Sequence, residues 1–260
     1  MFERSINLGK ARILLTNDDG IEARGLKLLE KAARALCKDV WVVAPEQEQS
    51  GASHSLTLHR PLRVRQLGPR RFAVDGTPTD CVLLAVNRLL RDKRPTLALS
   101  GVNGGANLGD DVTYSGTVAA AMEATLLGVP AIALSMTFKD RAKIRWATAE
   151  KFAPEVVRRL VAQPWPKNTL INVNFPDLAP GAVKGFAVTR QGRHKIGDQL
   201  MERTDPRGRP YFWIGPLREK DPGLPGTDLA AITKGWIALT PILLDLTNDA
   251  ALGPLRKVFR

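Results

Sequence analysis

The chain has 260 residues, of which 44% are hydrophobic and 25% are charged, and its formal net charge is +12. This composition is typical of a globular protein that is long enough to bury a substantial core. No apolar run approaches the roughly 20 residues that span a bilayer. The first residues also lack the apolar segment and small-residue cleavage site of a signal peptide. The sequence therefore argues against membrane-spanning and secreted proteins.

The two cysteines, Cys37 and Cys81, lie far apart and form no CxxC arrangement. This spacing predicts buried reduced thiols rather than a disulfide or a zinc site. With the missing signal peptide and membrane span, it predicts a cytoplasmic protein that has no membrane partner.

The positive charge is unevenly distributed along the chain. Residues 1–140 hold 18 Lys and Arg against 15 Asp and Glu, whereas residues 141–260 hold 20 against 11. The basic residues of the second part stand among Gly, Asp and Pro, without the aromatic residues that stack on bases. We therefore expect no dedicated nucleic-acid partner, and we expect the charge to attract small phosphorylated anions.

The first half of the chain alternates between short apolar runs and amphipathic stretches. The predicted strands are residues 13–15, 40–44, 97–99 and 131–134, with shorter β segments at 62–65 and 72–74. The predicted helices are residues 26–36, 80–90 with Thr79 as N-cap, and 118–127. This order predicts an α/β fold, in which helices cover both faces of a mostly parallel sheet.

The later chain differs in character. It begins with a predicted helix at 146–161 and a strand at 170–174. Shorter β-like runs follow at 185–189, 210–214 and 236–239, together with a hairpin over 203–213 that turns at 205–208. The segments at 243–246 and 252–259 are too isolated to fold alone. We expect a catalytic core over 1–181 and, over 182–260, a β-rich extension that packs on the core and on a partner subunit.

Asp18 and Asp19 follow the first predicted strand, at the edge where open α/β sheets bind their ligands. Two adjacent carboxylates repel each other unless a cation or a proton compensates them. A hard divalent metal, which prefers oxygen ligands, is one solution. An Asx-type turn that caps the next helix is the alternative.

Three further loops are expected at the same edge. One contains Ser50, and a second, rich in Gly and Asn, contains Asn103 and Asn107. The third places Ser115, Gly116 and Thr117 at a predicted helix start, where N–H groups and the helix dipole favour phosphate. Ordinary loops and a Ser or Thr N-cap are the alternatives. The lack of a Gly-Lys-Ser/Thr ending argues against a P-loop.

Several other catalytic classes lack their signatures. The chain has no Gly-x-Ser-x-Gly elbow, no HExxH and no GxGxxG after the first predicted strand. In the sequence, no carboxylate is paired with His54 or His59, and we expect His59 at the surface.

Five motifs, in this order and spacing, resemble those of the SurE nucleotidases. They are ILLTNDDG (13–20), VAPEQEQSG (43–51), GTPTDC (76–81), SGVNGGANLG (100–109) and YSGTV (114–118). DPRGRPY (205–211) and GTD (226–228) also resemble that family, so the resemblance extends over nearly the whole chain. Each motif is short, but the ordered set is highly specific.

The resemblance implies a metal-dependent phosphatase that acts on nucleoside 5′- and 3′-monophosphates, and in some relatives on short polyphosphate. It implies one Mg²⁺ or Mn²⁺ per subunit, held by Asp18, Asp19, Ser50 and Asn103. It also implies a Rossmann-like three-layer α/β/α sandwich, with a C-terminal extension of β-hairpin and terminal helix that forms dimers or tetramers.

The expected mechanism assigns roles around that metal. Asp18 or Asp19 would accept a proton from the attacking water. The phosphate oxygens would be held by five residues: Asn17, Asn107, Ser115, Gly116 and Thr117. The sequence leaves open which Asp is the base.

Three other readings compete with this one. A receiver-like domain also has an acidic pair but needs an Asp at the end of a later strand, where this chain has Leu99-Ser100. A haloacid-dehalogenase-type phosphatase needs Asp-x-Asp, which Asp18-Asp19 does not match. A non-catalytic nucleic-acid-binding protein would bind with a steep salt dependence and release no phosphate from nucleotides.

Overall fold

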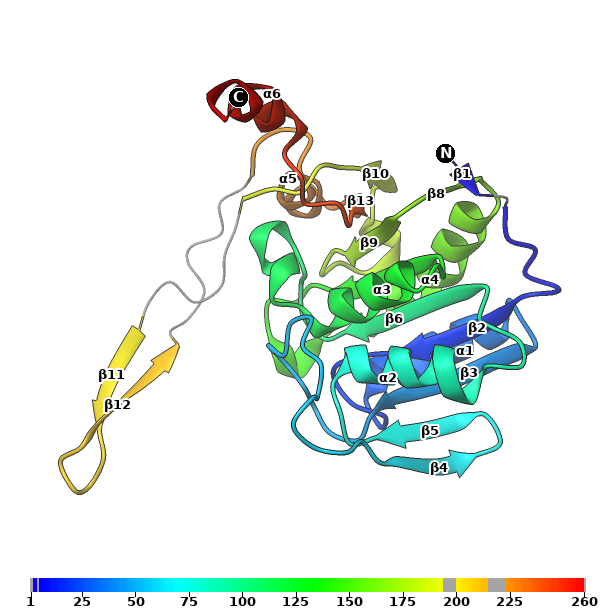
Figure 1. The fold of residues 1–260 in the computed structure, drawn as a ribbon, viewed down its shortest axis with the longest axis horizontal. Helices are drawn as coiled ribbons and strands as arrows, with labels where there is room; N and C mark the ends of the chain where they lie inside the picture. The colour runs from blue at the N-terminus through cyan, green and yellow to red at the C-terminus, as the bar shows by residue number, and fades with distance from the viewer. Residues whose placement is uncertain (1, 4, 194–199, 215–222, 260) are drawn as a thin grey trace.

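The computed structural model describes residues 2–3, 5–193, 200–214 and 223–259. Its main sheet has nine strands in the order β10-β13-β9-β7-β6-β2-β3-β5-β4 (Figure 1). The strands of this sheet are β2 (Arg12–Thr16), β3 (Asp39–Pro45), β4 (Val64–Gly68), β5 (Arg71–Val74), β6 (Leu97–Asn103), β7 (Ala131–Met136), β9 (Thr169–Phe175), β10 (Phe186–Val188) and β13 (Ile237–Leu243). A separate two-stranded sheet joins β1 (Phe2–Glu3) to β8 (Trp165–Pro166).

The α-helices cover both faces of the sheet, as the order of the predicted elements indicated. They are α1 (Arg24–Arg34), α2 (Pro78–Leu84), α3 (Gly116–Leu126), α4 (Trp146–Val161), α5 (Asp228–Thr233) and α6 (Asp249–Val258). Short 3₁₀ turns lie at η2 (Gly109–Thr113), η3 (Arg141–Lys143) and η4 (Pro180–Ala182), and α2 continues into a π-helix, η1 (Ala85–Leu89). The expected α/β/α sandwich is confirmed.

The central strand β2 shows why the sheet is buried on both sides. All five of its residues are buried. Ile13 and Leu15 point into the core beneath α1 and α4, whereas Leu14 between them belongs to the core beneath α2 and α3. Because side chains alternate between the faces of a strand, a continuous apolar run packs against helices on both faces.

The topology places a binding edge at the end of β2. This strand pairs in parallel with β3 on one side and with β6 on the other. The chain therefore reverses its winding direction beside β2, and ligands of open α/β sheets bind at such a point, beyond the carboxyl ends of the strands.

One helix boundary differs from the prediction. The N-cap of α2 is Thr77 rather than Thr79, and a capping box pairs its hydroxyl and backbone N–H with Asp80. Pro78 occupies the first helical turn, where its missing N–H costs nothing. Thr79 is buried inside the helix.

The last part of the chain contributes both to the sheet and to outlying elements. β13 pairs antiparallel with β9, and β10 pairs in parallel with β13. The predicted hairpin is confirmed as β11 (Leu200–Thr204) and β12 (Pro210–Ile214), and Figure 1 shows it standing apart from the main sheet. Every residue of both strands is exposed, and α6 has no buried residue. In the described part of the chain, no helix has the length and apolar character needed to cross a bilayer.

Candidate metal and phosphate site

The acidic pair lies where the sequence predicted, directly after β2. Asp18 is 5% exposed and Asp19 is half-buried. Gly20 follows with a φ of +98°, a left-handed conformation that glycine adopts without strain. Within the described residues, neither carboxylate forms an ion pair with Lys, Arg or His.

Burial raises the pKa of both carboxyl groups, and nearby negative charge adds to the shift, from Glu48 at Asp18 and from Asp18 at Asp19. For Asp18 burial is the largest cause, and the hydrogen bond from Thr117 opposes it. For Asp19 burial and then the negative charge of Asp18 raise the pKa to about 6, while the N–H of Gly104 and the charge of Arg141 oppose the shift. The pair therefore lacks sufficient compensating positive charge.

The start of α3 touches Asp18 directly. The Thr117 hydroxyl donates a hydrogen bond of 2.5 Å to Asp18 Oδ1. Ser115 is the N-cap, and its Oγ accepts a hydrogen bond from the N–H of Val118. A Cβ atom on Gly116 would lie 2.7 Å from the Asp18 Cβ, so only glycine fits there. The predicted phosphate-binding motif and the acidic pair thus lie side by side.

The loop after β3 also reaches the pair. The N–H of Gln49 donates to the Asp18 carbonyl at 2.8 Å. The exposed Ser50 donates from Oγ to Glu48 Oε1 at 2.7 Å, and this bond is the main reason why the pKa of Glu48 is lowered. The lone pairs of Ser50 Oγ stay available to a cation.

The loop after β6 reaches Asp19. The N–H of Gly104 donates to Asp19 Oδ2 at 3.3 Å. Asn103 donates from Nδ2 to the Gly105 carbonyl at 3.0 Å, and its Oδ1 accepts no hydrogen bond within the described ranges. This oxygen is therefore also available as a ligand.

Asn107 and Asn17 are engaged in the protein interior. The Asn107 side chain donates to Ser135 Oγ at 2.8 Å, and its backbone is held by Asn172 and Asn174. Asn17 is fully buried; its Nδ2 donates to the Gly20 carbonyl at 2.9 Å. Its Oδ1 is buried without a hydrogen-bond donor. These bonds show that both asparagines order the loops that carry the site.

His54 has a carboxylate partner, contrary to the absence of pairing read from the sequence. Its Nε2 lies 3.0 Å from Glu123 Oε2, on α3. The two residues are 69 positions apart, so only the folded chain brings them together. His59 is exposed, as expected.

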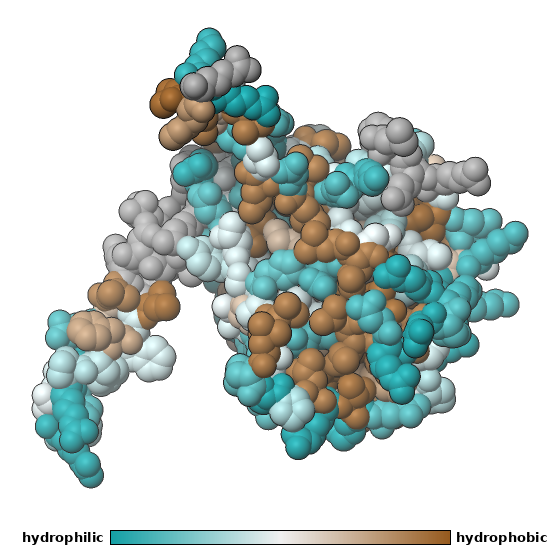
Figure 2. Space-filling view, viewed as in Figure 1, coloured by the Kyte–Doolittle hydropathy of each residue, from teal (hydrophilic) through white to brown (hydrophobic). Residues whose placement is uncertain are grey.

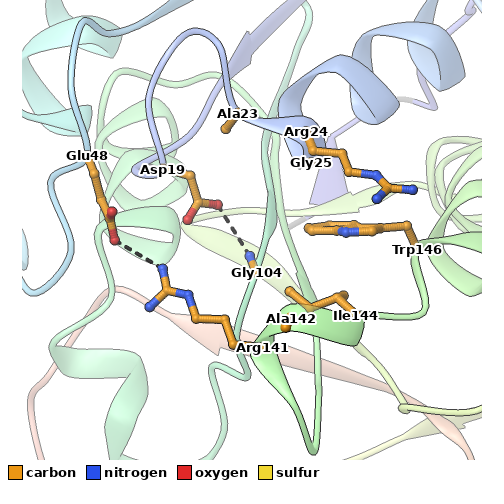
Figure 3. Close-up of a pocket in the computed structure, with 10 residues that line it drawn as sticks. All are labelled: Asp19, Ala23, Arg24, Gly25, Glu48, Gly104, Arg141, Ala142, Ile144 and Trp146. Carbon is orange, nitrogen blue, oxygen red and sulfur yellow. Dashed lines mark hydrogen bonds and ion pairs between the residues drawn. The ribbon is translucent and has the colours of Figure 1, made fainter.

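A cavity of about 350 Å³ opens beside Asp19 (Figure 3). Its polar lining includes Asp19, Glu48 and Arg141, and its apolar lining includes Ile144 and Trp146. Arg141 lies in η3, where its guanidinium pairs with Glu48 at 3.3 Å. This wall was not predicted from the sequence, because residues 141–146 carry no recognisable motif.

The residues present fit a hard divalent cation. The predicted ligands offer only oxygen atoms: two carboxylates, a hydroxyl and an amide oxygen. Both carboxyl groups have a raised pKa, mainly because they are buried, and a bound cation would offset that cost of burial. The described residues contain no cluster of three or more His, Cys, Asp and Glu, and two of the four predicted ligands, Ser50 and Asn103, are of other residue types.

Comparison with known proteins agrees with this geometry. The family model described as "Survival protein SurE" matches residues 13–198. The chain belongs to the SurE family. The matched segment of this SurE chain contains the acidic pair, the three neighbouring loops and the cavity wall.

Relatives in the SurE family match along nearly their whole length. The protein named 5'-nucleotidase SurE from Paramagnetospirillum magneticum is 59% identical over 248 residues, which cover 95% of each chain. The protein of the same name from Rhodospirillum rubrum is 53% identical over 262 residues, covering 100% of both chains. The crystal structure of SurE protein from Aquifex aeolicus has a TM-score of 0.83 at 38% identity, covering 96% of this chain and 100% of that one.

Proposed function

We propose that this SurE-family chain is a metal-dependent phosphatase that hydrolyses nucleoside 5′- and 3′-monophosphates, with activity on short polyphosphate. The names of its relatives support nucleotidase activity. The observation that carries the proposal is the contact between the uncompensated acidic pair and the start of α3. This contact supports the proposal, because a cation held by the acidic pair would lie beside a phosphate bound at the helix start.

Asp18, Asp19, Ser50 and Asn103 would hold one Mg²⁺ or Mn²⁺. When bound, such an ion supplies positive charge for the phosphate oxygens and lowers the pKa of a coordinated water. The hydrogen bonds of Asp18 with Thr117 and of Asp19 with Gly104 support the proposal, because they orient both carboxylates before a metal arrives.

The first turn of α3 would bind the phosphate. Its N–H groups lie at the positive end of the helix dipole, and two of them already have acceptors: the Thr117 N–H donates to the Asp18 carboxylate and the Val118 N–H to Ser115 Oγ. Ser115, Gly116 and Thr117 would hold phosphate oxygens, with the Ser115 O–H and the Gly116 N–H as the donors, because the Ser115 Oγ only accepts a hydrogen bond whereas the Thr117 hydroxyl already donates to Asp18. Asn17 and Asn107 would mainly order the surrounding loops, because their side chains donate hydrogen bonds within the protein. Their contribution to phosphate binding would be smaller than that of the α3 start.

One of the two carboxylates would also accept the proton of the attacking water. Asp18 and Asp19 are both adjacent to the proposed phosphate seat, so either one is a suitable general base. The negative charge that develops on the transferred phosphoryl group would be stabilised by the N–H groups of α3.

We further propose a homo-oligomer built through residues 182–260, and a cytoplasmic enzyme without a dedicated nucleic-acid or membrane partner. Large apolar side chains of the hairpin are exposed, among them Phe212, Trp213 and Ile214. Leu255 and Val258 of α6 are also exposed. Figure 2 shows hydrophobic surface, in brown, on both outlying parts of the molecule. Apolar groups gathered on outlying elements are typical of surfaces that a second subunit covers. We also propose that the chain divides into a catalytic core over residues 1–181, which contains all the proposed catalytic residues, and the extension over 182–260.

A phosphate-release screen tests the proposed function. The substrates are nucleoside 5′- and 3′-monophosphates, p-nitrophenyl phosphate and short polyphosphate, each with Mg²⁺, Mn²⁺ or EDTA. We expect release from the nucleotides with a metal and none with EDTA. Absence of metal-dependent release from every substrate would contradict the proposal.

A further inference from the structure

The cavity beside Asp19 has two chemically different ends. In Figure 3, Asp19 and Glu48 stand on one side, and the ring of Trp146, seen edge-on between Arg24 and Ile144, lies on the other. Arg141 lies between the two carboxylate-bearing loops and the apolar wall. At about 350 Å³ the cavity is within the range of small-molecule sites. With the proposed cation bound at the acidic pair, the cavity would suit a ligand that is anionic at one end and flat and apolar at the other.

Trp146 is held in place by the backbone of two glycines. A Cβ atom on Gly25, in α1, would lie 3.1 Å from the Trp146 ring, and one on Gly104 would lie 3.7 Å from it. Gly104 is also the residue whose N–H reaches Asp19. Gly104 therefore contacts Asp19 through its N–H and lies close to the Trp146 ring. The acidic end and the aromatic end of the cavity are neighbours at this residue.

The indole of Trp146 is packed against the protein, but it is neither fully buried nor hydrogen-bonded within the described residues. Trp146 remains partly exposed at the start of α4. Its ring N–H donates no hydrogen bond within the described residues, whereas the indoles of Trp41 and Trp165 donate to Asp39 and to the Thr169 carbonyl. A buried or half-buried indole normally finds such a partner. An aromatic face and a free donor beside an anion site are what a nucleobase would contact.

We propose that this cavity seats the nucleoside of the substrate, with the base stacked on the indole of Trp146 and Ile144 completing the apolar wall. The inference rests on the proposed function, since it assumes that the phosphate lies at Asp19. Trp146 is then the residue that favours nucleotides over other phosphate monoesters, without taking part in phosphate transfer. Stacking accepts every base, so the site predicts broad base tolerance.

A kinetic comparison tests the role of Trp146. We expect Trp146→Ala to lower kcat/KM for AMP and GMP by about tenfold to a hundredfold. Activity on ribose 5-phosphate, which has no base, should change less than about twofold. Trp146→Phe, which keeps a ring, should retain most nucleotide activity. An equal loss on AMP and on ribose 5-phosphate would overturn the proposal while leaving the phosphatase function intact.

A binding measurement separates the two proposals. Adenosine and guanosine, which have no phosphate, should quench the tryptophan fluorescence of the metal-free protein. The quench should disappear in Trp146→Phe. It should remain in Trp41→Phe, the matched control, which removes a different indole that stacks on Phe72. This titration needs no turnover, so it tests the cavity even if the protein releases no phosphate. No quench at millimolar nucleoside, or an unchanged quench in Trp146→Phe, would overturn the proposal.

Discussion

The hydroxyl of Thr117 donates a hydrogen bond to Oδ1 of Asp18, and this bond joins the first turn of α3 to the end of β2. The two residues are 99 positions apart. Their contact fixes a buried carboxylate against the helix terminus that is proposed to hold phosphate.

Removal of the Thr117 hydroxyl should weaken metal binding. Thr117→Val is nearly isosteric but leaves the buried Asp18 without its donor, which raises the pKa of that carboxyl further. We expect the affinity for Mn²⁺, measured by calorimetry, to fall about 10- to 100-fold. Thr117→Ser keeps the hydroxyl and should bind within about threefold of the wild type. Equal affinities in all three proteins would show that the bond does not orient Asp18.

The pH dependence of stability should reflect Asp19. Its pKa rises from the ordinary 3.8 to about 6 in the folded protein. The folded state therefore holds this proton more tightly than the unfolded chain does. The Asp19 contribution to the free energy of unfolding is largest at low pH, and it falls between about pH 4 and pH 6. Urea unfolding of the metal-free protein across this range, compared with Asp19→Asn, isolates the contribution.

Asp19→Asn should therefore have opposite effects with and without metal. At pH 8, loss of the repelling charge should raise the Tm of the metal-free protein by about 2–4 °C. Saturating Mn²⁺ should raise the Tm of the wild type and leave that of the variant nearly unchanged. A variant that is less stable than the wild type in EDTA would contradict the account of uncompensated charge.

Two glycines that face Trp146 should respond differently to alanine. A Cβ atom on Gly25 would lie 1.8 Å from the Val102 carbonyl oxygen, whereas one on Gly104 would meet nothing closer than 3.4 Å. Alanine normally stabilises a helix by about 1 kcal/mol relative to glycine. In α1 we expect the reverse, a loss of about 3 kcal/mol or more for Gly25→Ala. Gly104→Ala, the matched control, should cost under about 1 kcal/mol in urea unfolding. Similar losses in both would refute the packing argument.

Asp228 should connect the C-terminal part of the chain to the site. This fully buried carboxylate accepts N–H bonds from Gly109, Gly192 and Leu229 at 2.8–2.9 Å. Gly109 begins η2, between the loop after β6 and α3. Asp228→Ala leaves these donors unpaired and should cost about 3 kcal/mol of unfolding free energy. Asp92→Ala, at an exposed carboxylate, should cost under about 1 kcal/mol. A loss below 1 kcal/mol at Asp228 would argue against the link.

Much of the fold could be predicted because its signals are local. The helix predicted at 146–161 coincides with α4, and the apolar runs at 13–15 and 131–134 lie within β2 and β7. The hairpin at 200–214 follows from alternation around an Asp-Pro-Arg-Gly turn. The N-cap of α2 was misassigned because Thr77 and Thr79 both precede Asp80. Only the capping box distinguishes them.

The site was predictable in part, for a related reason. Asp18, Gly116 and Thr117 stand in motifs that the ends of strands and helices bring together. The pairing of His54 with Glu123 spans 69 positions, and the Glu48–Arg141 ion pair spans 93. The wall formed by Trp146 depends on backbone packing against Gly25, which is 121 positions away (146 − 25). No periodicity or motif marks such contacts, so they emerge only from the packed structure.

The most direct test of the central claim is turnover of a nucleoside 5′-monophosphate by Asp19→Asn at saturating Mn²⁺. The matched control is Glu46→Gln, an exposed carboxylate in a neighbouring loop that pairs with Arg65. If Asp18 and Asp19 anchor the metal of a phosphatase, Asp19→Asn loses at least about a hundredfold in kcat/KM, and Glu46→Gln stays near the wild type. Unchanged turnover in Asp19→Asn would contradict the account.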